Sequence, residues 1–385
     1  MDSTPELRGF RIHTANVGLK DESDDFTVIA SEVPAVCAGV FTQSRFAGPS
    51  VVLSRESVAD GAARAIVVLS RNANVATGKQ GLDNAREVRG AVAGLLGVPE
   101  TDVVIASTGV IGRQYPMPEI RSRMGTMSWP FPGADFAAAA RAIMTTDTHP
   151  KLLSARCGEA TVVGIAKGVG MIEPNMATLL TFFCTDAQLE QPVLDQVFRR
   201  VMARTFNAVS IDTDTSTSDT AVVLANGLAG PVDLDSFEAA LHEVALGLVR
   251  QIVKDGEGAS KLIEVRVTGA RDDAQAKRVG KTVVNSPLVK TAVHGADPNW
   301  GRVAMAIGKC EDDLDIVPDN CTIGFGDEEL YPAEAGEQEL EQLRGYLRGD
   351  EIVITIDLGI GGGAFTVYGC DLSEGYIRIN ADYTT

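Results

Sequence analysis

A threonine stands between turn-forming residues and an apolar run in the middle of the chain. From Lys167 to Phe183 the sequence reads KGVGMIEPNMATLLTFF, with two glycines and Pro174 shortly before Thr178. Because glycine and proline break regular structure, we expect Thr178 at a turn that enters a buried strand. In a self-cleaving precursor, such a hydroxyl attacks the carbonyl carbon before it, which a strained backbone favours. An ordinary turn leading into a core strand fits the same residues, and the segment alone leaves both interpretations open.

Cleavage before Thr178 would turn this residue into an amino-terminal nucleophile. An N-to-O acyl shift followed by ester hydrolysis would release its α-amine. A free α-amine has a pKa of about 7.7–8.0, so it can act as general base for the hydroxyl of the same residue. The segment is therefore compatible with acyl-transfer chemistry.

Eight blocks of sequence, this segment included, resemble the ornithine acetyltransferase family. Members of that family cut themselves between the Ala and Thr of Asn-Met-Ala-Thr, which here are Ala177 and Thr178. The remaining blocks follow in the family's order and span nearly the whole chain: NANVATG (72–78), STGVIG (107–112), AIMTTDT (142–148), DTSTSDT (214–220), DGEGASK (255–261), HGADPNWGR (294–302) and the extreme carboxyl terminus.

The resemblance implies roles for residues at matching positions. Thr178 would be the nucleophile, and Thr108 and Gly109 would form the oxyanion hole, whose donors stabilise the negative oxygen of a tetrahedral intermediate. Without the resemblance, Thr108 and Gly109 would fit an ordinary turn after a strand. The implied substrate-binding residues are Thr145, Lys167, Thr178, Glu257, Asn380 and Thr385.

Two of these positions suit the charges of an amino-acid substrate. The ammonium group of Lys167 can bind an α-carboxylate, and the carboxylate of Glu257 can pair with the side-chain ammonium of ornithine. Each also has a simpler interpretation. Lys167 fits a solvated surface lysine, and Glu257 fits an acidic loop residue at the end of a helix.

The family implies a complete activity and an assembly. The enzyme would move an acetyl group from N2-acetyl-L-ornithine to L-glutamate by a ping-pong mechanism through acetyl-Thr178, with no metal and no cofactor. An α chain (1–177) and a β chain (178–385) would form an α2β2 heterotetramer. Two alternatives stay open: an amidohydrolase or aminopeptidase on the same scaffold, and a non-catalytic homologue that binds amino acids.

The chain departs from the family at a few positions. Many members end in Tyr-Arg-Thr, whereas this chain ends Tyr383-Thr384-Thr385, and Gly and Asn are common at the positions of Thr213 and Ser218. These changes resemble the branch associated with clavulanic acid biosynthesis. They concern the preference for an acceptor, because the residues matched to nucleophile, oxyanion hole and Lys167 are intact.

A histidine triad is a further possibility. His294 lies close in sequence to Asp297 and Asn299 and could serve a hydroxyl nucleophile. Because the family's base is the new α-amine, we expect this motif to shape a turn, with Trp300 in the core.

The pattern of apolar residues predicts a mixed α/β (α+β) fold. The resemblance implies a layered α/β sandwich of two lobes, with an Ntn-hydrolase-like arrangement. The helix expected over residues 236–254 has the clearest pattern, with apolar residues at helical spacing and Asp235 or Ser236 as its cap. The expected helices are 84–96, 135–143, 194–205, 236–254 and 340–347, and the expected strands are 26–30, 65–69, 103–106, 161–166, 179–184, 220–225, 262–267, 352–356 and 364–368.

Composition excludes several classes of protein. The formal charge of −18 over 385 residues argues against binding nucleic acid, which needs a basic surface. We expect no targeting segment, no membrane helix, no zinc site from the four scattered histidines, and no nucleotide cofactor, since no glycine cluster has the required spacing. The six cysteines form no CxxC pair, so we expect reduced thiols in the cytoplasm.

Overall fold

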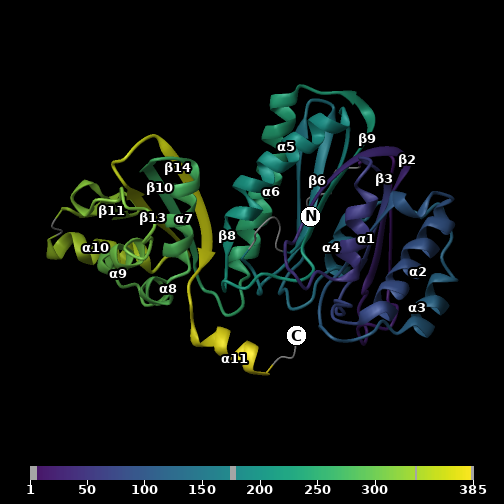
Figure 1. The fold of residues 1–385 in the computed structure, drawn as a ribbon, viewed down its shortest axis with the longest axis horizontal. Coiled ribbons are helices and arrows are strands. Elements are labelled where there is room, and N and C mark those ends of the chain that lie inside the picture. Colours follow the sequence, from purple (N-terminus) through teal and green to yellow (C-terminus); the bar gives the residue numbers. More distant parts are fainter. Residues whose placement is uncertain (1–6, 174–178, 334–335, 383–385) are drawn as a thin grey trace.

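The computed structural model describes residues 7–173, 179–333 and 336–382, which fold into two lobes (Figure 1). Within these residues, the first lobe holds an eight-stranded sheet and the second a six-stranded sheet. The mixed α/β class and the two lobes are thus confirmed. No helix in the described part combines the length and apolar character needed to cross a bilayer.

The sheet of the first lobe has the order β4-β3-β2-β9-β7-β6-β5, with β1 beside β2. Its strands contain most of the strands predicted for the first 231 residues. The bounds are β1 (Phe10–Ala15), β2 (Phe26–Phe41), β3 (Ala62–Leu69), β4 (Val103–Ser107), β5 (Lys151–Cys157), β6 (Ala160–Lys167), β7 (Leu180–Gln188) and β9 (Thr220–Pro231).

The long strand β2 joins two halves of this sheet. Its first part, up to Ala30, pairs with β1 and β3, and its second part, from Val36, pairs with β9; the register with β3 shifts between Ala30 and Ala35. Side chains from both halves meet in one core, so the halves are stacked face to face. This core includes Ile29, Ile66, Val68, Val104 and Ala106 from one half and Val163, Ile165, Phe182, Val222 and Leu224 from the other.

Helices cover the two outer faces of the stacked halves. Side chains of α1 (Pro49–Ser57), α2 (Gly78–Leu96) and α3 (Met117–Met124) pack outside β3 and β4. Those of α5 (Gln191–Arg204) and α6 (Leu234–Lys254) pack outside β6, β7 and β9. The resulting order of layers is helix, sheet, sheet, helix, as Figure 1 shows, and the predicted layered sandwich is confirmed.

Helix α6 forms where its apolar spacing predicts it. Its expected core residues (Phe237, Leu241, Val244, Ala245, Leu248 and Ile252) are all buried. The expected cap, Asp235 or Ser236, is wrong. The helix begins at Leu234, because the carboxylate of Asp233 accepts the backbone N–H of Ser236 at 2.9 Å and satisfies a free donor of the first turn.

The second lobe packs four helices on its own sheet, whose order is β12-β11-β13-β10-β14-β8. The strands are β8 (Val209–Ser210), β10 (Leu262–Ala270), β11 (Thr322–Phe325), β12 (Glu328–Tyr331), β13 (Glu351–Asp357) and β14 (Gly363–Cys370). The helices are α7 (Asp273–Val284), α8 (Pro287–His294), α9 (Trp300–Ile307) and α10 (Glu337–Leu347).

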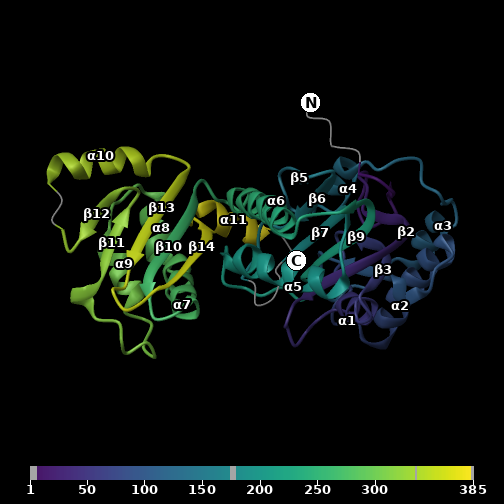
Figure 2. The ribbon, with the colours of Figure 1, turned by 90° about the horizontal axis from the view of Figure 1, so that it is seen from above.

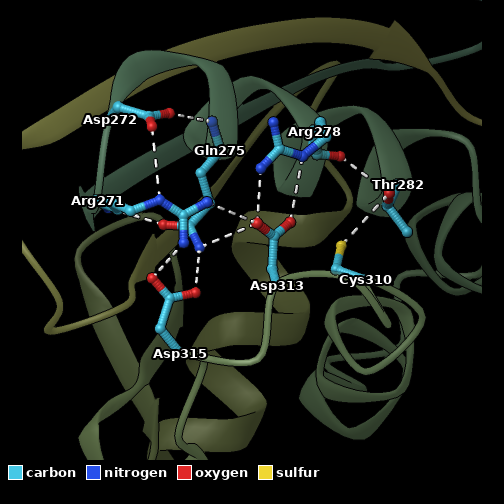
Figure 3. Close-up of polar contacts among 8 residues, drawn as sticks. All are labelled: Arg271, Asp272, Gln275, Arg278, Thr282, Cys310, Asp313 and Asp315. Atoms are coloured by element: carbon cyan, nitrogen blue, oxygen red, sulfur yellow. Dashed lines mark hydrogen bonds and ion pairs between the residues drawn. The ribbon is translucent and has the colours of Figure 1, made fainter.

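A group of charged and polar side chains fixes α7 to the loop that follows α9. At its centre, Asp313 accepts hydrogen bonds from Arg271, Gln275 and Arg278, and Asp315 accepts from Arg271 and Gln275 (Figure 3). These five residues are the Asp313 cluster below.

The lobe boundary does not coincide with the expected division into residues 1–177 and 178–385. Strand β6 from the first segment pairs with β7 from the second, and β2 pairs with β9. Helix α11 (Glu374–Asp382) leaves β14 and lies between the lobes in both views (Figures 1 and 2). Both expected chains therefore contribute neighbouring strands to one sheet.

Candidate active site

One cavity of about 230 Å³ collects every predicted site residue that the structure describes: Thr108, Gly109, Thr145, Lys167, Glu257 and Asn380. Ala177, Thr178 and Thr385 lie outside the described residues. Leu179 and Leu180, which follow Thr178 in the chain, line the same cavity. Residues far apart in sequence thus meet where the two stacked half-sheets end.

The Thr108–Gly109 turn follows β4 directly. The N–H of Thr108 donates to the carbonyl of Leu69 on the parallel neighbour β3 at 3.1 Å. Gly109 has a φ of 127°, and a Cβ there would lie 2.2 Å from the carbonyl carbon of Arg71. Only glycine fits this position, which fixes the turn against the end of β3.

Lys167 is the last residue of β6 and is 9% exposed, so the interpretation as a solvated surface lysine is wrong. Its Nζ donates to Oγ1 of Thr108 at 3.3 Å, which leaves the hydroxyl hydrogen of Thr108 for an acceptor in the cavity. Burial lowers the pKa of Lys167, whereas the neighbouring carboxylate of Asp147 raises it.

Asp147, Lys151 and Asp255 form a buried cluster behind the cavity wall, named the Lys151 cluster here. Nζ of Lys151 lies 2.8 Å from Asp147 and 2.6 Å from Asp255. Asp147 also accepts the backbone N–H of Gly168 at 2.7 Å and that of Thr145 at 3.1 Å. The cluster therefore holds two backbone segments of the cavity.

Glu257 lines the same cavity. Its carboxylate accepts hydrogen bonds from Thr146 at 3.3 Å and from Asn380 of α11 at 2.9 Å. Its backbone N–H donates to the carbonyl of Val169 at 2.8 Å. At Gly170 a Cβ would lie 2.5 Å from the Glu257 carboxylate, so the glycine makes room for it.

Asp212 holds the backbone of the segment that precedes the expected cleavage bond. Asp212 was not predicted as a site residue from the sequence. Its carboxylate accepts the backbone N–H groups of Met171 at 2.6 Å and Ile172 at 2.8 Å. Met171 has a φ of 56°, a left-handed conformation that non-glycine residues rarely adopt. The DTSTSDT block and the residues just before it were the available signal.

A second missed carboxylate, Asp219, lies on the far side of that bond. It is fully buried in the cavity wall and accepts the backbone N–H of Leu179 at 2.8 Å. Burial raises its pKa well above the usual value for aspartate. Leu179 itself has a φ of 123°, so the backbone is strained on both sides of the undescribed residues.

Thr213 and Ser218, the two positions near Asp219 at which the chain departs from the family, occupy different places in the structure. Thr213 has a φ of 69°, a conformation that glycine adopts without strain, which explains the family's preference there. Ser218 is buried and lines the cavity. Of the two, Ser218 is the one positioned to contact a substrate.

His294 does not line the cavity. Its Nδ1 lies 2.7 Å from Asp371, whose same oxygen also accepts the Ser260 hydroxyl at 2.5 Å. Histidine and serine therefore compete for one carboxylate oxygen, unlike a triad, in which histidine stands between the other two. Trp300, expected in the core, is half-buried at its edge: it packs against the core of the second lobe and stacks on Tyr331 at 5.0 Å between ring centroids.

The sequence profile of the ArgJ family matches residues 11–385. Glutamate N-acetyltransferase Oat2 of Streptomyces clavuligerus is 68% identical over 100% of both chains. Arginine biosynthesis bifunctional protein ArgJ 2 of Nostoc sp. is 54% identical, over 100% of this chain and 98% of its own. The solved ornithine acetyltransferase of Mycobacterium tuberculosis, complexed with ornithine, is 32% identical over 44% of this chain and 94% of its own, with a TM-score of 0.41.

Proposed function

The chain belongs to the ArgJ family, and from this premise we propose that it is a glutamate N-acetyltransferase. It takes the acetyl group of N2-acetyl-L-ornithine and passes it to L-glutamate. The observation that carries the proposal is the cavity that unites the Thr108 hydroxyl, the buried Lys167 ammonium and the Glu257 carboxylate beside the start of β7. Lys167 can bind the α-carboxylate that both substrates share, and Glu257 can bind the side-chain ammonium, which glutamate lacks.

The proposed nucleophile is Thr178, freed when the chain cuts itself after Ala177. Support comes from the strained φ values of Met171 and Leu179 on either side of the bond. Asp212 and Asp219 anchor the flanking backbone amides, so the bond lies between two fixed points. A bond whose flanking residues are held in strained conformations is a suitable target for an N-to-O acyl shift.

Two half-reactions follow, both through tetrahedral intermediates. In the first, the Thr178 oxygen adds to the acetyl carbonyl carbon while its α-amine takes the hydroxyl proton. The negative oxygen is stabilised at Thr108 and Gly109, the carbon–nitrogen bond breaks, and the proton leaves with the amine of ornithine. In the second, the amine of glutamate attacks acetyl-Thr178, and the same steps run in reverse to release N-acetylglutamate.

The two chains that cleavage produces are proposed to stay together and to form an α2β2 heterotetramer. The sheet gives a physical reason for the first part, because β6 and β7 would belong to different chains and share a continuous ladder. We place the reaction, which uses small-molecule substrates and no metal or cofactor, in the cytoplasm.

A mass spectrum of the purified protein tests the proposal. We expect two chains, 1–177 and 178–385, with the second gaining one acetyl group after incubation with N2-acetylornithine. Thr178→Ala should remain a single chain that takes up no acetyl group. Thr181→Ala is the matched control, because Thr181 is a neighbouring threonine of β7 that binds the carbonyl of Ile165 instead of facing the cavity.

Two results would contradict the proposal. Active protein whose only amino terminus is Met1 or Asp2 would exclude cleavage before Thr178. Release of free acetate at the same rate with and without glutamate would favour the hydrolase alternative.

A further inference from the structure

The charge of the cavity is unfavourable for the second substrate of the proposed function. Lys167 is the one cation among the described residues that line it, against the carboxyl groups of Asp212, Asp214, Asp219 and Glu257. Ornithine brings a side-chain ammonium to this acidic wall, whereas glutamate brings a second carboxylate. The whole chain is acidic as well, with a formal charge of −18. Apart from Lys167, the charges of the cavity therefore offer no attraction for the second carboxylate of glutamate.

An open recess of about 1190 Å³ lies directly beside the cavity and has the opposite charge. Four cations and two anions line it: Lys20, Arg71, Arg113 and Arg141, with Asp21 and Glu22. Thr145 lines both the recess and the cavity. The recess thus borders the substrate side of the proposed active site.

The oxyanion turn forms the wall between the two spaces. Gly109 lines the cavity and the next residue, Val110, lines the recess. Val110 donates its N–H to the carbonyl of Arg71 at 3.2 Å. The cavity and the recess are therefore neighbours across the Gly109–Val110 backbone.

The cations of the recess come from separate elements that the fold brings together. Arg71 follows β3 and Arg113 follows β4, at the carboxyl ends of two parallel strands. The space outside such strand ends commonly binds ligands in α/β proteins. Arg141 lies in the last turn of α4 (Phe136–Ala142).

Lys20 is held in a loop that is ordered before any ligand binds. The buried carboxylate of Asp25 accepts the backbone N–H groups of Val17, Leu19 and Lys20 at 2.6–2.7 Å. Nζ of Lys20 donates to the carbonyl of Ala142 at 3.0 Å. The loop is thereby fixed to the end of α4, close to Arg141.

Two of the cations of the recess, Arg113 and Arg141, are exposed and only weakly compensated by the protein. Arg113 is exposed and forms no ion pair with any residue in the described ranges. Arg141 lies 4.0 Å from Asp135, and both side chains are more than half exposed. Burial lowers the pKa of Lys20 to about 8; Asp25, Asp147 and Asp24 raise it, and Arg71 lowers it further.

We infer that this recess is an acceptor subsite, which captures the dicarboxylate glutamate and delivers its amine past Thr145 to the acetylated nucleophile. The inference rests on the proposed function. The acidic cavity favours ornithine and its acetylated precursor, and the basic recess collects glutamate, which has two carboxylates and one ammonium, before glutamate enters the cavity and reaches Lys167. Charge attraction of this kind raises the rate of association and is weakened by salt.

The test removes the two most exposed cations with the variant Arg113→Gln/Arg141→Gln and follows each half-reaction separately. Discharge of acetyl-enzyme to glutamate should fall about 10-fold in kcat/KM at low ionic strength. Acetyl-enzyme formation from N2-acetylornithine should change less than about two-fold. At about 1 M salt, where the Debye length is about 3 Å, the difference from the wild-type protein should disappear.

A matched variant and a second acceptor complete the design. Arg344→Gln/Arg348→Gln removes two charges from α10 and its carboxyl-terminal end in the second lobe and should leave both half-reactions unchanged. Discharge to glutamine, which lacks the second carboxylate, should be equally slow with and without Arg113 and Arg141. Equal losses in both half-reactions, or a loss that glutamine shares, would overturn the inference.

Binding of glutarate to the unacetylated protein separates this inference from the proposed function. Glutarate has the two carboxylates and cannot accept an acetyl group. Saturable binding that salt weakens and Arg113→Gln/Arg141→Gln removes would support the subsite even in a protein without transferase activity. Glutarate binding that is the same in wild-type and variant protein would exclude it.

Discussion

The two lobes contain ionic clusters of similar chemistry and very different burial. In the Lys151 cluster of the first lobe, all three side chains are at most 3% exposed. In the Asp313 cluster of the second lobe, Asp313 is 4% exposed while its partners Arg271 and Arg278 are 48% and 52% exposed. Water therefore solvates one side of the second cluster and is excluded from the first.

This difference separates a positioning role from a stabilising one. Burying charges is costly, and the Lys151 cluster is buried where the carboxylate of Asp147 accepts the backbone N–H groups of Thr145 and Gly168 in the cavity wall. The Asp313 cluster joins α7 to a loop (Figure 3), and none of its residues lines the cavity. A substitution that breaks the Lys151 cluster should therefore change the rate of acetyl transfer as well as stability. A substitution that breaks the Asp313 cluster should change only stability.

The largest effect is expected from Lys151→Met. The substitution leaves Asp147 and Asp255 buried without their shared cation, which costs about 3–5 kcal/mol, and the free energy of unfolding in urea measures the loss. Arg278→Met is the matched change in the Asp313 cluster, with an expected cost of about 1 kcal/mol or less. Similar losses in the two variants would show that burial does not distinguish the clusters.

Glu257→Gln asks whether a carboxylate that faces the cavity discriminates between substrates without supporting the fold. A charge-assisted contact is worth roughly 1.5–3 kcal/mol, so acetyl-enzyme formation from N2-acetylornithine should fall about 10- to 100-fold. Discharge to glutamate should fall less, because glutamate has no side-chain ammonium. Lys167→Met is the comparison variant and should weaken both half-reactions, since both substrates have the α-carboxylate. Equal losses for Glu257→Gln would remove its role in discrimination.

Asp147→Asn tests whether the Lys151 cluster acts on the chemistry through charge. The carboxylate of Asp147 raises the pKa of Lys167 against the lowering by burial; Asp219 and Glu257 also raise it, and Lys151 lowers it. Without the carboxylate of Asp147, Lys167 loses its proton at lower pH. In the pH profile of the rate of acetyl-enzyme formation, the fall on the alkaline side, the alkaline limb, should therefore move to lower pH. The acid limb, set by the α-amine of Thr178, should stay in place.

Asp255→Asn is the control for that experiment. Asp255 pairs with the same Lys151 at 2.6 Å but is not among the groups that shift the pKa of Lys167. Its variant should lose stability without moving the alkaline limb. An equal movement in both variants would indicate a structural cause, and Asp147→Glu should restore the limb if charge is the cause.

The sequence predicted those features that depend on local pattern or on the family blocks. Apolar spacing located α6, and alternating or continuous apolar runs located β3, β6, β7 and β10. Helices α7 to α9 were missed, because α7 contains three valines and Gly280 in its second half, and the others are only eight residues long. The predicted residues of the cavity came from the resemblance, since their contacts span up to 123 positions in the chain.

The Lys151 cluster and the recess could not be found from the sequence alone. Lys151 begins β5 and looks like an ordinary charged residue; its burial depends on Asp255, 104 positions away. The four cations of the recess are separated by long stretches of an acidic chain, and only the return of β3, β4 and α4 to one end of the sandwich brings them together.

The smallest effect is expected from Asp313→Asn, which tests the exposed cluster of the second lobe. Hydrogen bonds from Arg278 lower the pKa of Asp313 although desolvation by burial raises it, and Arg271 lowers it further. A carboxyl group whose pKa is lower in the folded than in the unfolded state stabilises the fold above the unfolded value of about 3.9. This contribution is lost as the pH falls through the lower pKa of the folded state.

Asp313→Asn should therefore lower the free energy of unfolding by about 1 kcal/mol at pH 7 and by almost nothing at a pH below the pKa of Asp313 in the folded state. Both half-reactions should stay unchanged. Urea unfolding of wild-type and variant protein over this pH range provides the measurement. A difference that stays constant with pH would mean that Asp313 acts through packing or geometry and not through its charge, and the contrast with the Lys151 cluster would then rest on burial alone.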